Sequence, residues 1–178
     1  MSAQVIYKDT LSGNQTGSVS RTYDNLFRVT SRTVNGTDTI NFGYDNDNLL
    51  TTAGAMTIGR EVQKGGLING TTLGNVTTTN SYSDFAEIES YNAQYNSSDI
   101  YHVSYIRDKL GRIITKTETI NAVTTVFEYD YDLAGRLVEE KTNSVVTNTW
   151  DYDPNGNRTH INGAQIATYD DQDRLLTN

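Results

Sequence analysis

The chain has 178 residues, a net charge of −8, 12 tyrosines, a single proline and no cysteine. The absence of cysteine excludes disulfides and thiol chemistry, and the acidic balance argues against nucleic acid or an anionic membrane as partner, because both attract basic surfaces. No run of residues is long and apolar enough for a membrane-spanning segment, and no basic-then-apolar signal peptide follows Met1.

A tyrosine-aspartate dipeptide recurs along the chain, which predicts a repeat architecture. Successive copies start 21, 38, 25, 24, 21 and 17 residues apart. A unit of 21 to 25 residues has room for two strands and two turns, since a strand advances about 3.3 Å per residue. The copies begin, in chain order, at Tyr23, Tyr44, Tyr82, Arg107, Tyr131, Tyr152 and Tyr169.

Strands are predicted immediately before these dipeptides. Large residues alternate with polar ones over 40–44, 103–105, 127–131 and 150–152. A period of two is typical of a strand with one buried face, so we expect the aromatic side chains on one face and polar groups on the other. The chain has 26 threonines and 18 asparagines, residues that favour strands and turns respectively. No stretch carries apolar residues at helical spacing over three turns, so no helix is predicted.

Each dipeptide is expected to end a strand and open a turn. The Asp carboxylate can accept hydrogen bonds from nearby backbone N–H groups, and the glycine that follows tolerates a left-handed backbone. A second set of turns is predicted where the return strand ends, at 35–36, 121–122, 143–144 and 162–163, each beginning with asparagine. The structural signature comprises Tyr23, Asp24, Tyr44, Asp45, Tyr82, Asp108, Gly111, Arg112, Tyr131, Asp132, Gly135, Arg136, Tyr152, Asp153, Gly156, Tyr169, Asp170 and Arg174.

The fold class predicted is all-β, with tandem β-hairpins forming a curved or spiralling antiparallel sheet. Residues 1–22 are expected to form an N-terminal lead-in or capping strand, and residues 23–178 the hairpin array. The long step at 51–81 is interpreted as a spacer with an extra pair of short strands, or alternatively as a loop. Because the last predicted strand has only begun at Asn178, the chain looks like a segment of a longer protein.

The signature closely resembles the Rhs, or YD, repeat. Copies such as Tyr131-Asp132-x-x-Gly135-Arg136 carry this resemblance over about residues 21 to 178. The family includes bacterial Rhs polymorphic toxins, the C component of Tc toxins and the teneurins, and its repeats form hairpins of a long sheet that spirals into a hollow shell. The resemblance implies an extracellular or cell-surface bacterial protein, whose partners are repeats of the same or a neighbouring chain, an enclosed toxin polypeptide or a surface glycan.

Some copies depart from the signature. Arg107 stands where tyrosine is expected, and Ser83 interrupts the third dipeptide, which leaves Asp84 as its aspartate. Where the signature has glycine, the sequence has Asn48, Ala86 and Asp173, so the turns at these copies are expected to differ.

No catalytic, cofactor-binding or metal-binding residues are predicted. His102 and His160 lie far apart in the sequence and without carboxylates at metal spacing. Residues 153–157 resemble the start of a calcium loop, but Arg158 stands where an EF-hand needs glycine. The adjacent acids Glu139 and Glu140 point to opposite faces of a strand and cannot act together as acid and base.

Three classes of function follow from the sequence. We expect a noncatalytic scaffold, part of a shell or fibre that encloses or presents other polypeptide. The alternative is a module that binds carbohydrate or a cell-surface partner through aromatic strand faces, which would require exposed rings. An enzyme would require a clustered site that the sequence does not contain.

Overall fold

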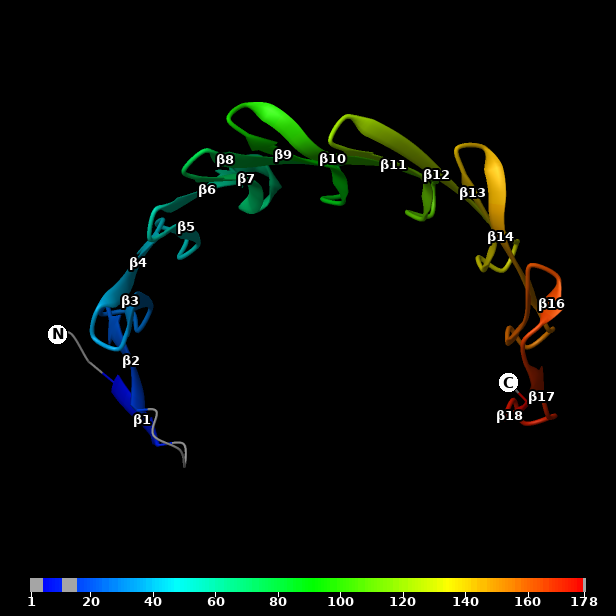
Figure 1. Ribbon diagram of the computed structural model, residues 1–178, viewed down its shortest axis with the longest axis horizontal. Coiled ribbons are helices and arrows are strands. Elements are labelled where there is room, and N and C mark those ends of the chain that lie inside the picture. The colour runs from blue at the N-terminus through cyan, green and yellow to red at the C-terminus, as the bar shows by residue number, and fades with distance from the viewer. Residues whose placement is uncertain (1–4, 11–15, 178) are drawn as a thin grey trace. The chain divides into compact units, whose positions relative to one another are not determined.

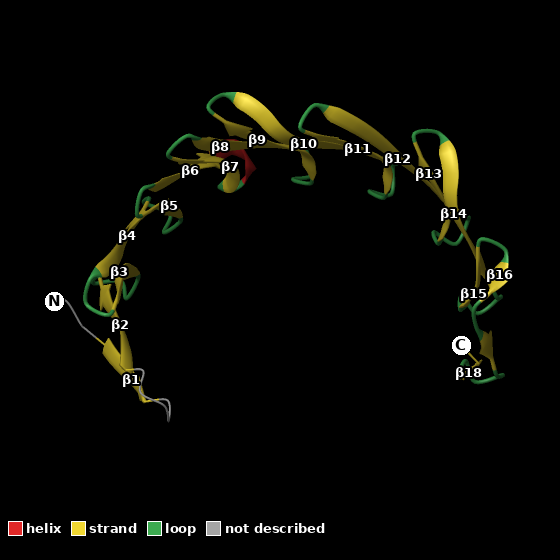
Figure 2. Cartoon of the chain, in the orientation of Figure 1, coloured by secondary structure: helices red, strands yellow, loops and turns green. Residues whose placement is uncertain are grey.

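The structure is a computed structural model that describes residues 5–10 and 16–177. Almost all of the described chain is strand and turn (Figures 1 and 2). The strands are β1 (Val5–Thr10), β2 (Thr16–Tyr23), β3 (Val29–Val34), β4 (Asp38–Tyr44), β5 (Leu50–Ala53), β6 (Met56–Glu61), β7 (Leu67–Leu73), β8 (Val76–Tyr82), β9 (Ile88–Tyr95), β10 (Ser98–Arg107), β11 (Ile113–Ile120), β12 (Val123–Tyr131), β13 (Leu137–Thr142), β14 (Val145–Tyr152), β15 (Arg158–Ile161), β16 (Ala164–Gln165), β17 (Thr168–Tyr169) and β18 (Leu175–Thr177).

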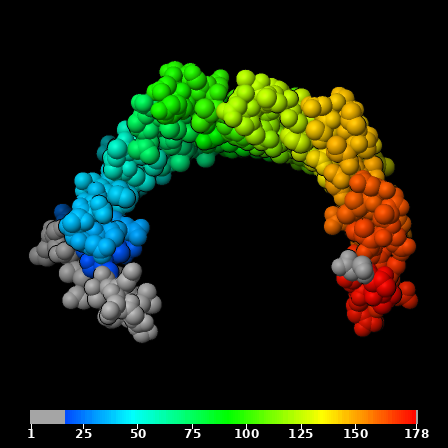
Figure 3. Space-filling view, viewed as in Figure 1, coloured from blue at the N-terminus to red at the C-terminus, as the bar shows by residue number. Residues whose placement is uncertain are grey.

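The chain divides into two compact units, residues 1–80 with 94–97 and residues 81–93 with 98–178. In the first unit, β1 to β8 follow one another in the sheet in sequence order. The second unit has β9 to β16 in sequence order, and β17 pairs with β18 as a separate sheet. Within each unit the colours of Figure 3 also follow sequence order. The strands pair in antiparallel fashion, as in β12 with β13 and β13 with β14. These pairings confirm the all-β class and the tandem hairpins.

One kind of turn follows the signature tyrosine, and we call it the signature turn. In the copy at Tyr131, the N–H of Asp132 donates to the carbonyl of Arg136 (2.9 Å) and the N–H of Gly135 donates to the carbonyl of Asp132 (3.0 Å). Gly135 has a φ of 83°. This is a three-residue hairpin loop, in which a type I turn is followed by a left-handed residue.

The second kind of turn has two loop residues, both with positive φ, and we call it the Asn turn. Asn143 and Ser144 have φ values of 50° and 65°. Such a backbone is that of a type I′ turn, which matches the twist of the flanking strands and favours asparagine at its first position. The Asn143 side chain also accepts a hydrogen bond from the N–H of Val126 (2.9 Å). Further Asn turns lie at 35–36, 96–97, 121–122 and 162–163, and only the one at 96–97 was not predicted from the sequence.

The long step between Tyr44 and Tyr82 contains β5 to β8, whereas the step from Tyr131 to Tyr152 contains only β13 and β14. The structure therefore has the extra pair of strands and not the loop alternative. Between β6 and β7 lies the single described helix, a 3-10 turn η1 at Val62–Lys64, which Figure 2 colours red. It ends at Gly65, whose φ of 66° is left-handed.

Burial differs from the expected pattern of one buried face. In the described residues, the buried hydrophobic side chains are those of Ile58, Ala93, Val103 and Ala167. All six residues of β13 are half-buried, whichever face they occupy. The expectation was wrong because strands of each unit contact mainly their neighbours in the sheet, so a side chain is covered by adjacent side chains and not by a second layer.

The role of residues 1–22 as a lead-in or capping strand stays a prediction, as do the array at 23–178 and the spacer bounds at 51–81. Of the first of these segments, residues 1–4 and 11–15 lie outside the described residues. In the described part of the chain, no helix is long and apolar enough to cross a membrane.

Candidate functional site

The signature residues occupy equivalent places in successive hairpins. Each signature tyrosine is the last residue of its strand, and Arg107 ends β10 in the same way. Each signature aspartate is the first residue of a signature turn. The fourth turn residue has positive φ, which is 80° at Gly111 and 94° at Gly156. The fifth is an arginine in four copies: Arg28, Arg112, Arg136 and Arg174.

The aspartate and the arginine of one turn hold each other. The Asp132 carboxylate accepts hydrogen bonds from the Arg136 backbone N–H (2.8 Å) and from Arg136 Nε (2.6 Å). Asp108 binds Arg112 in the same two ways, at 3.0 and 2.7 Å. The same pairs of bonds join Asp24 to Arg28 and Asp170 to Arg174.

These bonds favour the charged form of the carboxylate. At Asp132, the hydrogen bond from the Arg136 N–H and then that from its side chain lower the pKa, against an opposing effect of burial. At Asp108, burial raises the pKa, but the hydrogen bonds from Arg112 and Leu110 together outweigh it and leave the pKa lowered. The pKa is lowered also at Asp24, Asp153 and Asp170.

The lowered pKa values predict loss of stability in acid. A carboxyl whose pKa is lower in the folded state stabilises the fold above its unfolded pKa, about 3.9 for aspartate, and this contribution disappears as the pH falls through the folded pKa. We expect the contribution of these aspartates to the free energy of unfolding to stay constant between pH 5 and 7 and to decline from about pH 4 downward. Urea unfolding followed by circular dichroism at a series of pH values measures it. A constant stability down to pH 2 would contradict the prediction.

Consecutive copies meet through the arginine of one turn and the tyrosine before the next, and we call this contact the joint. The Arg136 guanidinium lies 4.8 Å from the centre of the Tyr152 ring. The Tyr152 hydroxyl donates to the carbonyl of Leu137, the residue after Arg136 (2.8 Å). Arg112 and Tyr131 form the same joint, as do Arg28 and Tyr44. A charge, a ring and a backbone carbonyl thus connect residues about 16 to 19 positions apart.

The third copy has a joint of different chemistry. Glu87 stands at the arginine position and Arg107 at the tyrosine position, with Arg107 Nε 3.8 Å from the Glu87 carboxylate. Arg107 Nη1 donates to the carbonyl of Ile88 (2.7 Å), which is the place that receives the tyrosine hydroxyl in other joints. In the long step, Arg60 donates to the equivalent carbonyl of Leu50. The departures therefore keep this carbonyl hydrogen-bonded.

The opposite charges at the third joint predict a compensating pair of substitutions. Glu87→Arg places two guanidinium groups together and is expected to lower the free energy of unfolding by about 0.5–1 kcal/mol. Adding Arg107→Tyr creates the arginine-tyrosine joint of the other copies and is expected to recover most of this loss. Urea unfolding of both single variants and the double variant gives the coupling. Additive effects of the two substitutions would show that the side chains do not form a joint.

The turns that lack the signature residues do not differ, so that expectation was wrong. Asn48, Ala86 and Asp173 have φ values of 66°, 62° and 59°, and each N–H donates to the carbonyl of the first turn residue, as in the glycine copies. Phe27, which stands at the glycine position of the first copy, adopts the same conformation (φ 61°). The backbone hydrogen bonds define this loop, and they do not depend on the side chain at its fourth position.

Ser83, not Asp84, occupies the aspartate position of the third turn. The Ser83 hydroxyl accepts hydrogen bonds from the N–H groups of Phe85 (3.2 Å) and Glu87 (3.3 Å), as the carboxylates do elsewhere. A serine side chain is long enough to accept from an N–H two residues on, which explains why this departure leaves the turn intact.

Ala86 carries the cost of a left-handed backbone without a side-chain function that the structure identifies. Ala86→Gly is expected to raise the free energy of unfolding by about 1 kcal/mol, because glycine removes the strain of its Cβ. Thermal and urea unfolding measure the change. Ala134→Gly, at the preceding position of another signature turn, is the control and should not stabilise. An Ala86→Gly variant less stable than the parent would contradict the assignment of strain.

The candidate chemical groups lie apart. His102 is opposite Thr119 in the sheet, and His160 is opposite Asp151. In residues 5–10 and 16–177, no group of three or more His, Cys, Asp or Glu side chains is arranged to hold a metal ion. Glu139 binds Lys141 (2.8 Å), which also binds Asp130 (2.9 Å). The hydrogen bonds to these two carboxylates raise the Lys141 pKa, and Glu139 has the larger effect.

A family model described as Teneurin YD-shell matches residues 3–178. The chain is similar in fold to a chain of the Photorhabdus luminescens Tc holotoxin pore, with a TM-score of 0.68, 16% identity, and coverage of 84% of this chain and 9% of that one. A porin-like protein from Bacteroides uniformis has a TM-score of 0.35, 10% identity and 91% coverage of both chains, which is too weak a likeness to carry an argument. No curated protein matches the chain.

Proposed function

The chain belongs to the teneurin YD-shell family, and from this premise we propose that it is a noncatalytic segment of the shell or fibre of an exported bacterial protein, which encloses or presents other polypeptide. That the segment is a structural scaffold follows from the family. Export, enclosure and the lack of catalysis are the proposal. The joints are the observation that supports it most directly.

The polar groups of the signature residues are already engaged in holding the hairpins together. The hydroxyls of Tyr44, Tyr131 and Tyr152 donate to backbone carbonyls, and the signature carboxylates accept from their own turns. A residue whose polar atoms are already hydrogen-bonded has little left for a substrate. This use of the side chains supports a structural role, in which each hairpin is held by its neighbours.

The carbohydrate-binding alternative would require aromatic side chains that offer open faces. The rings at the joints are half-buried, and an arginine lies over those of Tyr44, Tyr131 and Tyr152. Tyr95 is more open, with 51% of its surface exposed, but lies next to an Asn turn. We therefore keep this alternative second.

Protease protection in the complete gene product that contains this chain tests the enclosing role. If the array encloses polypeptide, trypsin should leave a protected fragment that originates outside residues 1–178. A variant with Tyr131→Ala and Tyr152→Ala, which opens two joints, should lose the protection, whereas Val145→Ala in an exposed position should keep it. Equal digestion of all segments in the parent protein would refute enclosure.

The noncatalytic part of the proposal has its own test. Purified protein is expected to leave glycan and peptide substrates unchanged. Turnover that disappears when His102, His160 or Glu139 is replaced, without loss of fold, would overturn the noncatalytic role.

A further inference from the structure

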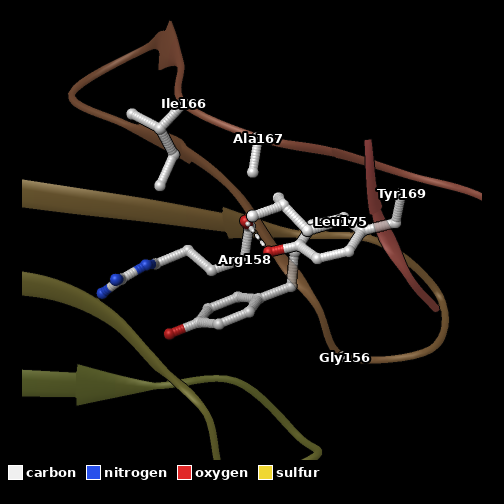
Figure 4. A pocket seen from close by; sticks show the side chains of 7 residues that line it. Gly156, Arg158, Ile166, Ala167, Tyr169 and Leu175 are labelled. Atoms are coloured by element: carbon white, nitrogen blue, oxygen red, sulfur yellow. Dashed lines mark hydrogen bonds between the residues drawn. The ribbon is translucent and has the colours of Figure 1, made fainter. Parts of the chain in front are cut away.

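A pocket lies beside the last signature tyrosine, in the second unit. Its walls come from the ends of β14 and β15 and from the segment around β17 and β18 (Figure 4). In Figure 4 the Ala167 methyl group points toward Leu175 and Tyr169. The pocket is lined by Tyr152, Gly156, Arg158, Ile166, Ala167, Tyr169 and Leu175.

The pocket coincides with a missing aromatic ring. The residue two positions before the end of the signature strand points to the same face as the signature tyrosine. This residue is aromatic in four copies, as Phe42, Tyr105, Tyr129 and Trp150, and it is Ala167 in the last copy. Ala167 is only 5% exposed, so the alanine is itself covered while the space that a ring would fill stays open.

The backbone around Ala167 also differs from that of the other copies. The strand is interrupted there, since β16 ends at Gln165 and β17 begins at Thr168. The N–H groups of Ile166 and Ala167 both donate to the carbonyl of Thr159 (2.8 and 3.3 Å). This shared acceptor anchors the interrupted segment to β15, so the walls of the pocket are hydrogen-bonded in place.

The pocket has one positive group. Arg158 is exposed, and its guanidinium makes no hydrogen bond or ion pair in the described part of the chain. Arg112 and Arg136, which follow two of the other signature turns, each bind a carboxylate, whereas Arg158 does not. An unpaired guanidinium beside an apolar and aromatic wall favours a ligand that combines a ring with a nearby carboxylate.

We propose that this pocket binds an aromatic side chain of another polypeptide segment, with a neighbouring carboxylate of that segment paired to Arg158. The preceding copies have Tyr105, Tyr129 and Trp150 at the equivalent sequence position, so the occupant supplies the ring that this copy lacks. The ring would pack against Tyr152, Tyr169 and Leu175. This binding site does not depend on enclosure or on any other part of the proposed scaffold role.

Calorimetric titration of the 178-residue chain with small probes tests the site. N-acetyl-phenylalanyl-glutamate amide should bind saturably in the millimolar range, and its leucyl counterpart should not. The phenylalanyl-glutamine probe, which has no charge, should bind up to about fivefold more weakly, as an exposed ion pair allows. Tighter binding of the free acid N-acetylphenylalanine than of the peptide would identify a small aromatic acid and overturn the polypeptide occupant. Absence of saturable binding by all probes would overturn the site.

Substitutions locate the binding. Ala167→Phe supplies the missing ring from within, so it should abolish binding and raise the melting temperature by about 2–4 °C. Ala134→Phe is the matched control, because Phe85 occupies the equivalent turn position of another copy; it should bind the probe like the parent chain. Arg158→Ala should remove the preference for glutamate over glutamine and keep the ring-dependent binding. Ala167→Leu, which fills less of the pocket, replaces the first variant if that one does not fold. Binding retained after the pocket is filled would refute the proposal.

Discussion

Replacing Tyr131 with alanine is expected to lower the free energy of unfolding by about 2–4 kcal/mol. The substitution removes three interactions together. These are the packing of a half-buried ring, the hydrogen bond from the Tyr131 hydroxyl to the carbonyl of Ile113 (2.8 Å), and the contact of the ring with the Arg112 guanidinium, 4.6 Å from the ring centre. The Ile113 carbonyl would also lose a partner. Urea unfolding followed by circular dichroism measures the loss.

Two controls separate these contributions. Tyr131→Phe removes only the hydroxyl and is expected to cost about 1 kcal/mol. Tyr95→Ala removes a tyrosine that is 51% exposed and does not occupy a joint position, and it should cost clearly less than Tyr131→Ala. Equal losses for Tyr95→Ala and Tyr131→Ala would show that the joint contributes nothing beyond the burial of a ring.

Gly135→Val is expected to lower the free energy of unfolding by about 1–3 kcal/mol, because a β-branched residue is strained at positive φ. Gly135 has a φ of 83°, and a Cβ at this place would come no closer than 3.5 Å to its nearest neighbour, the Arg112 side chain. Backbone strain, and not a steric clash, is therefore the expected cause. Thermal unfolding measures the loss.

Leu133→Val is the matched control for this substitution. Leu133 lies in the same signature turn with a fully exposed side chain, and its backbone does not have a positive φ. A valine there should change the melting temperature little. A Gly135→Val protein that melts with the parent chain would show that the glycine is not required by the turn.

The hairpin order and both kinds of turn could be predicted from the sequence, because their signals are local. An aspartate or serine accepts from N–H groups two and four residues on, and an asparagine adopts positive φ, whatever lies elsewhere in the chain. The turns at Asn48, Ala86 and Asp173 could not be predicted from the missing glycine, because the hydrogen bonds of the whole loop outweigh the preference of one side chain. The pairing of Asp132 with Arg136 was within reach of the sequence, since a fixed spacing of four residues carries it.

The sequence by itself determined where strands end and how the chain reverses, since these depend on contacts within about five residues. Tertiary structure alone decided what the side chains do across copies. The stack of Arg136 on Tyr152 joins residues from different copies. At another joint the ion pair of Glu87 with Arg107 takes the place of such a stack, and neither residue matches the signature there. The pocket at Ala167 likewise became visible only in the structure, which brings Ala167 together with Tyr152, Tyr169 and Leu175. The physical reason is that cross-copy contacts depend on the register of strands about 20 residues apart, which the sheet fixes through backbone hydrogen bonds and not through any local residue pattern.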